Sequence, residues 1–257
     1  MKNNKTLAIF NLLGFILTII LNGLANALPI NGKTTGELSD AYPNLFVPAG
    51  FTFSIWGIIY LALLGFIIYQ LIAAFSSKIE NDGFIGQIGW IFVLSCLANA
   101  SWIVAWHYQY VIVSLVIMLC ILFSLIQIYQ RLQIGLVTVP TIQKWLVHVP
   151  FSIYLGWITV ATIANVTTLL VDFGWDGFGV EPEIWTMLVI VVGASIGSRV
   201  VQDRKDYAYG LVIVWAYYGI ISKRMSIDAD LYQTIIITAV AGIVLVVFTM
   251  IMRLVRR

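Results

Sequence analysis

The chain has 257 residues, of which 61% are hydrophobic and only 10% are charged. Soluble domains carry about 25% charged residues, so a soluble fold of this size would lack the polar shell that such an apolar interior needs. The formal net charge of +2, with its basic residues scattered, argues against nucleic acid as a partner. The composition therefore predicts an all-α integral membrane protein.

The uncharged apolar runs are long enough for helices that cross a bilayer. A helix needs about 20 residues to span the ~30 Å hydrocarbon core. The runs cover residues 7–28, 47–77, 84–106, 109–130, 145–171, 184–198, 207–222 and 231–252. We expect the short run 184–198 to continue past Arg199, whose side chain can reach the headgroups. The sequence thus predicts eight transmembrane helices.

The distribution of basic residues predicts the orientation, because Lys and Arg favour cytoplasmic loops. With the N-terminus inside, eleven basic residues lie on the inner side, namely Lys2, Lys5, Lys78, Arg131, Lys144, Arg199, Arg204, Lys205, Arg253, Arg256 and Arg257. Only three, Lys33, Lys223 and Arg224, lie on the outer side. We expect a multi-pass protein of a bacterial-type plasma membrane, with the N-terminus and the C-terminus cytoplasmic.

Two segments between the helices differ from the others. Residues 29–46 are rich in Gly, Pro and Asn and are too long for a minimal hairpin, which is typical of loops that cover a site. Residues 172–183 form the most polar break in the second half of the chain. We expect a domain boundary there, with a bundle over 1–171 and a three-helix extension over 172–257.

The predicted spans contain few groups for catalysis or ion coupling. No carboxylate or lysine lies in the middle of a span, and proton-coupled transporters usually need one there. His107 and His148 fall near opposite membrane faces and cannot share a metal. Cys96 and Cys120 are interpreted as buried structural thiols. We predict no catalytic residue and no metal site, and leave enzymatic activity open.

The membrane region carries aromatic and amide side chains instead. Of the nine tryptophans, some suit an interfacial aromatic belt, but Trp56 and Trp157 fall inside their helices. Asn99 and Asn165 are also intramembrane, where interhelical hydrogen bonding is the alternative to a role in ligand binding.

These side chains recur at helical spacing, which places them on shared helix faces. The groups are Trp56 with Tyr60, Asn99 with Trp102, and Trp157 with Ala161 and Asn165. The rise of about 1.5 Å per residue puts all three groups about 8–13 Å below the predicted outer ends of their helices, beneath the loop 29–46. An apolar, aromatic pocket with a few amides is how a flat hydrophobic ligand would be held.

Three ordered motifs resemble the TspO/MBR family, the tryptophan-rich sensory or translocator proteins. The stretch PNLFVPAGFTFSIWGIIYLALLG resembles the first-loop and second-helix signature of that family, with matches at Pro43, Pro48, Gly50, Trp56, Tyr60 and Gly65. The segments ANASW at 98–102 and WITVATIAN at 157–165 are similar to the Asn/Trp motifs of its third and fifth helices. Ala49 stands where the family has a second proline, and one residue is missing between Pro48 and Trp56.

The resemblance implies a TspO-like five-helix transmembrane bundle plus three additional C-terminal transmembrane helices. It also implies a membrane receptor or carrier for a tetrapyrrole of the porphyrin or haem type, or for another flat or sterol-like hydrophobic molecule, with stress sensing or signalling as candidate roles. The implied ligand contacts are Trp56, Tyr60, Asn99, Trp102, Trp157, Ala161 and Asn165, under a lid that contains Pro43, Pro48 and Gly50.

No cofactor is required by this interpretation, although a tetrapyrrole is a candidate ligand. The expected partners are the lipid bilayer, a hydrophobic small molecule and, as a candidate assembly, a second copy in a homodimer. The alternatives are a multi-helix small-solute transporter and a ligand-independent membrane scaffold.

Overall fold

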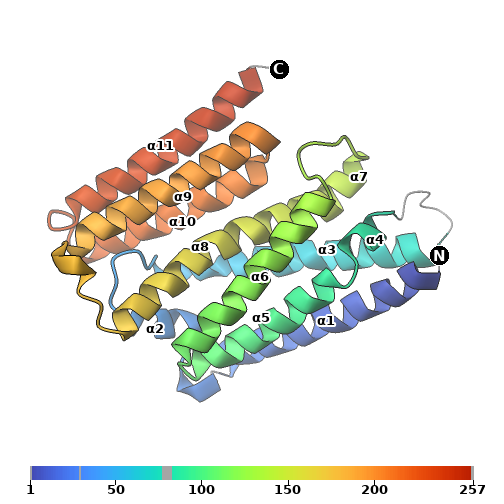
Figure 1. The fold of residues 1–257 in the computed structure, drawn as a ribbon, viewed down its shortest axis with the longest axis horizontal. Helices are drawn as coiled ribbons and strands as arrows, with labels where there is room; N and C mark the ends of the chain where they lie inside the picture. The colour runs from blue at the N-terminus through green and yellow to red at the C-terminus, as the bar shows by residue number, and fades with distance from the viewer. Residues whose placement is uncertain (1, 29, 77–82, 256–257) are drawn as a thin grey trace. The chain divides into compact units, whose positions relative to one another are not determined.

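The computed structural model describes residues 2–28, 30–76 and 83–255, and helices are the only regular structure in that part of the chain (Figure 1). Six helical stretches are long and apolar enough to cross a membrane, namely 3–27, 50–75, 111–131, 141–172, 182–204 and 233–255. Ile91–His107 is apolar but shorter. The prediction of an all-α integral membrane protein is confirmed, whereas the number of eight crossings stays a prediction.

Local sequence signals explain where several helices begin and end. The predicted run 84–106 is broken at Gly89, whose φ of +55° ends one helix before the next begins. The predicted run 184–198 continues past Arg199, as expected, and stops at Arg204, where Lys205 adopts a left-handed conformation. The following helix is capped by Asp206, whose carboxylate accepts a hydrogen bond from the Tyr209 amide at 3.1 Å.

The chain divides into two compact units, and each consists of two separate stretches of sequence. The first unit comprises Met1–Thr35 with Trp56–Leu155, and the second comprises Gly36–Ile55 with Gly156–Arg257. Segment 36–55 therefore belongs with the C-terminal helices. The division into 1–171 and 172–257 came from polarity and resemblance, and it stays a prediction.

The first unit contains the elements from α1 to the start of α8, without the segment 36–55. These are α1 (Lys2–Ala27), η1 (Ile30–Gly32), α3 (Ile55–Phe75), α4 (Gly83–Ile88), α5 (Ile91–His107), α6 (Val111–Arg131), α7 (Thr141–Gln143), the π-helical turn η3 (Lys144–His148) and the start of α8 (Val149–Asp172). Helix α5 packs against α1 and α6, which lie beside it in Figure 1. Phe66, Phe92 and Phe151 meet edge to face in the core, with ring centroids 5.1–5.7 Å apart.

The second unit contains the rest of α8 and the C-terminal helices. The other elements are α2 (Thr35–Asp40), η2 (Gly50–Ser54), η4 (Gly177–Gly179), α9 (Pro182–Arg204), α10 (Tyr207–Ile227) and α11 (Gln233–Val255). Helices α9, α10 and α11 pack against one another (Figure 1). A Cβ at Gly193 would lie 2.5 Å from the Tyr217 hydroxyl, so the absence of a side chain lets α9 approach α10 closely.

The structure corrects one prediction of burial. Cys96 is buried, but Cys120 is exposed on α6, so the prediction of a second buried thiol is wrong. A membrane helix can be apolar on its lipid face as well as on its packed face, so apolar neighbours do not show which way a side chain points.

Of the basic residues used for orientation, Lys78, Arg256 and Arg257 lie outside the described residues, as does Pro29 of the predicted loop, and the orientation stays a prediction.

Candidate functional site

Four of the seven predicted ligand contacts meet in the first unit, together with a fifth residue that the sequence did not indicate. The rings of Trp56 and Tyr60 stack 5.4 Å apart on α3, and the Trp102 ring of α5 lies 6.4 Å from Trp56. Tyr154 of α8 packs against Trp56 at 6.0 Å, and its hydroxyl accepts a 2.8 Å hydrogen bond from the Asn99 amide. We call these five residues the aromatic–amide cluster.

Trp56 and Tyr60 are half-buried and the rest of the cluster is buried, and its polar groups are only partly satisfied. Asn99 has no exposed surface, and Trp102 and Tyr154 are almost fully buried. The Tyr60 hydroxyl is also buried and lies near Asn99, yet it makes no hydrogen bond of normal geometry within the described part of the chain. Leaving a buried hydroxyl unsatisfied costs about 1–3 kcal/mol, so such a group marks a place where a bound molecule would be stabilised.

Trp106 extends the aromatic surface of the cluster along α5. Its ring lies 5.7 Å from Trp102 at an interplanar angle of 18°, and its indole N–H donates to the Thr35 carbonyl at 3.4 Å. A row of rings therefore runs from Trp106 through Trp102 and Trp56 to Tyr60. Offset aromatic faces of this kind suit a planar apolar ligand.

The other three predicted contacts lie in the second unit, on α8. Trp157 and Asn165 are each 2% exposed, and Ala161 is half-buried. The Trp157 ring meets Phe53 of η2 edge-on at 6.0 Å. The structure thus gathers one part of the predicted set in the first unit and aligns the other part on one helix of the second. That all seven residues line one pocket stays a prediction.

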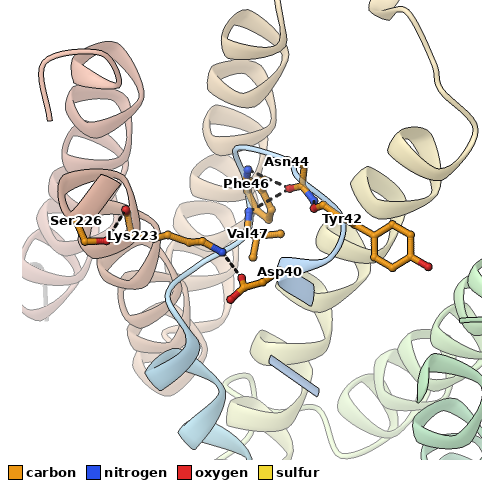
Figure 2. Close-up of polar contacts among 7 residues, drawn as sticks. All are labelled: Asp40, Tyr42, Asn44, Phe46, Val47, Lys223 and Ser226. Carbon is orange, nitrogen blue, oxygen red and sulfur yellow. Dashed lines mark hydrogen bonds and ion pairs between the residues drawn. The ribbon is translucent and has the colours of Figure 1, made fainter. Parts of the chain in front are cut away.

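The predicted lid belongs to a segment that is fastened to one face of α10. Lys223 forms an ion pair with Asp40 at the end of α2 (Figure 2). Further along, the Trp215 indole N–H donates to the Thr52 carbonyl, and the Ala49 amide donates to the Gly219 carbonyl, both at 3.0 Å. The three α10 positions are four residues apart, so they share one helix face. We call residues 36–55 the docked segment.

Asn44 fixes the turn at the centre of the docked segment. Its side-chain oxygen accepts hydrogen bonds from the amides of Phe46 at 3.2 Å and Val47 at 3.1 Å, and its amide donates to the Tyr42 carbonyl (Figure 2). Burial, and secondarily the carboxylate of Asp172, raise the pKa of the Tyr42 phenol. The turn is thus held by its own side chains as well as by α10.

Of the three residues predicted for the lid, Pro48 is buried, whereas Pro43 and Gly50 are exposed. Gly50 lies beyond the predicted loop 29–46 and begins η2, and the loop itself already contains the short helices η1 and α2. The role of the segment as a lid stays a prediction.

Ala49, the departure from the family pattern, has a direct structural consequence. Its φ of −61° would suit a proline, but a proline has no N–H to donate to Gly219. We therefore expect Ala49→Pro to loosen the docked segment and to lower the free energy of unfolding by about 1 kcal/mol, because one hydrogen bond is lost. Hydrogen exchange of the amides in 44–54 measures the loosening. Ala49→Ser, which keeps the N–H, should leave exchange unchanged, and equal exchange in the proline variant would contradict the assignment.

Sequence reasoning missed several residues that build these arrangements. Tyr154 was not singled out, although it lies three residues before Trp157 on the same apolar run. Asn22 of α1, whose amide donates to the Asn99 oxygen at 2.8 Å, was also missed, although an amide inside the first apolar run is a signal of the same kind as Asn99. Trp215 and Gly219 became significant only once the docked segment was seen to contact α10.

The comparisons with known proteins identified one family. The model of the family described as TSPO-like protein matches residues 8–252, and so extends over the C-terminal helices as well as the bundle. Comparison with curated proteins and with solved structures found no significant match.

Proposed function

This chain belongs to the family of TSPO-like proteins, and from that premise we propose that it is a membrane receptor or carrier for a flat hydrophobic ligand, with a tetrapyrrole as the leading candidate. The aromatic–amide cluster is the proposed contact surface. It offers aromatic faces, with Trp56 inclined by 22° to Tyr60 and by 33° to Trp102, and a few polar groups for orientation, which is the usual composition of a small-molecule site.

One observation carries the proposal. The Tyr60 hydroxyl is buried with no hydrogen-bond partner among the described residues, and the Tyr60 ring stacks on the Trp56 indole. A cluster that served only for packing would be more stable with an apolar atom at that position. Retention of the hydroxyl is understandable if a ligand completes its hydrogen bonding.

The proposal is tested by titrating the purified full-length protein with protoporphyrin IX and following the quenching of tryptophan fluorescence. We expect saturable binding in the parent and about tenfold weaker binding in Trp102→Leu, which removes one stacking face. Trp145→Leu is the matched control, because it also removes one tryptophan but from an exposed position. It should bind like the parent.

Two outcomes would favour the alternatives. Equal affinities in the parent and both variants would remove the cluster from the site. If no saturable quenching occurs and proteoliposomes accumulate a polar solute, the chain is a transporter, and if neither occurs, it is a scaffold.

The same titration on Trp157→Phe and Asn165→Leu tests whether the predicted residues of α8 also contact the ligand.

A further inference from the structure

The direction of each hydrogen bond in the chain that links α1, α5 and α8 can be deduced from one backbone carbonyl. The side-chain nitrogen of Asn22 contacts the Thr18 carbonyl at 3.0 Å, and a carbonyl can only accept, so this atom must be the amide N–H₂. The same nitrogen contacts Asn99 at 2.8 Å. The contacted Asn99 atom must therefore be its oxygen.

The orientation of Asn99 then fixes the role of the Tyr154 hydroxyl. Because the Asn99 oxygen points to Asn22, its N–H₂ points to Tyr154 and donates at 2.8 Å. A hydroxyl has one hydrogen to donate besides its acceptor lone pairs. Here the Tyr154 oxygen is used as an acceptor, and its own O–H finds no acceptor within the described part of the chain.

Tyr60 presents a second donor of the same kind. Its hydroxyl is buried and makes no hydrogen bond to any described residue, and its ring packs on the same Trp56 indole that contacts Tyr154. The cluster therefore holds two phenolic O–H groups that donate to no acceptor among the described residues. The oxygen and the nitrogen of the Asn99 amide each already make one hydrogen bond, to Asn22 and to Tyr154. The two hydroxyls are thus the donors that a ligand would engage.

We propose that the aromatic–amide cluster selects ligands that present a hydrogen-bond acceptor oxygen, a carboxylate or a carbonyl, to the hydroxyls of Tyr60 and Tyr154. This inference rests on the proposed function and adds to it the kind of hydrogen-bonding group that the ligand presents. A ligand that offers only an N–H or O–H at this position leaves both phenolic hydrogens unsatisfied. Sites with buried polar groups discriminate strongly against such partners, because the unmatched groups stay unpaired.

The test uses three porphyrin probes that share one macrocycle and differ in their side chains. Protoporphyrin IX carries carboxylates, its dimethyl ester carries neutral carbonyls, and etioporphyrin carries only alkyl groups. We expect etioporphyrin to bind the parent at least tenfold more weakly than protoporphyrin IX, because it has no side-chain oxygen to accept a hydrogen bond from either hydroxyl. The ester distinguishes the two acceptors. If the ester binds as tightly as protoporphyrin IX, a neutral carbonyl is a sufficient acceptor. If it binds as weakly as etioporphyrin, the site requires a carboxylate.

Two tyrosine variants test whether the preference for an acceptor oxygen depends on the two hydroxyls. Tyr60→Phe and Tyr154→Phe should each reduce the preference for protoporphyrin IX over etioporphyrin by about tenfold, because each removes one of the two hydroxyl donors. Tyr69→Phe is the control, because Tyr69 lies on the same helix but stacks on Phe84. It should bind all three probes like the parent.

The stabilities of the variants give an independent readout. Tyr154→Phe should lower the Tm, because it leaves the Asn99 amide without its acceptor, whereas Tyr60→Phe should not. A lower Tm in Tyr60→Phe would mean that this hydroxyl is bonded to Asn99 in the free protein, which overturns the inference. Equal binding of all three probes to the parent would also overturn it and leave the proposed function standing. Failure of all three to bind would remove the proposed function as well.

Discussion

Gly219→Ala is expected to lower the stability of the protein and to release the docked segment from α10, although alanine is the better helix former. A Cβ at this position would lie 2.1 Å from the Thr52 hydroxyl oxygen and 3.0 Å from a carbon of Pro48. Thr52 is fully buried, and its carbonyl accepts a hydrogen bond from the Trp215 indole N–H. Thr52 therefore cannot easily move away from the added Cβ. We expect a loss of about 1–3 kcal/mol in unfolding free energy, the usual cost of overpacking.

Gly57→Ala provides the matched control for this prediction. Gly57 lies in α3, and a Cβ there would meet nothing within 4 Å. That substitution should therefore be neutral or stabilise the protein by about 0.5–1 kcal/mol through helix propensity. Thermal unfolding and hydrogen exchange of residues 44–54 should separate the two variants. If Gly219→Ala proves as stable and as well protected as Gly57→Ala, the docked segment is not closely packed on α10.

The fold class followed from the sequence because membrane helices leave a simple signal. Uncharged apolar runs of about 20 residues are typical of membrane-spanning helices, and helix bounds such as Val111–Arg131 lie close to the predicted run 109–130. The break at Gly89 was not foreseen, because a glycine inside an apolar run does not show whether its φ is positive. The sequence also did not show which side chains of a membrane helix are buried against other helices, as the exposed Cys120 illustrates.

Helical spacing identified part of the candidate site and not the rest. Trp56 with Tyr60, and Asn99 with Trp102, were found because each pair lies on one helix. Tyr154 joins them through a contact between helices, which no spacing within a single run encodes. The attachment of Ala49 to Gly219 is a contact of the same kind, between backbone atoms 170 residues apart in the chain. Contacts of this kind depend on how the helices are placed, and that placement is decided by packing.

Asn99→Leu should have the largest effect on both stability and ligand binding in the first unit. The substitution removes the acceptor of the Asn22 amide and the donor to the Tyr154 hydroxyl at a position with no exposed surface. Measured hydrogen bonds in membrane proteins contribute about 0.6–2 kcal/mol each, so the loss of both should cost about 1–4 kcal/mol. We also expect at least tenfold weaker binding of protoporphyrin IX, because Tyr154 loses the partner that orients its hydroxyl.

Asn11→Leu separates the role of Asn99 in the site from its role in packing. Asn11 is also fully buried in the first unit, and its amide donates to Gln70 at 3.0 Å, so its replacement should likewise lower the Tm. It makes no contact with the aromatic–amide cluster among the interactions described, and protoporphyrin IX affinity should therefore stay at the parent value. Similar losses of Tm in the two variants, with a loss of affinity only in Asn99→Leu, would assign Asn99 to the ligand site. A parallel loss of affinity in both would instead mean that binding depends on the general stability of the bundle, and Asn99 would then be a packing residue.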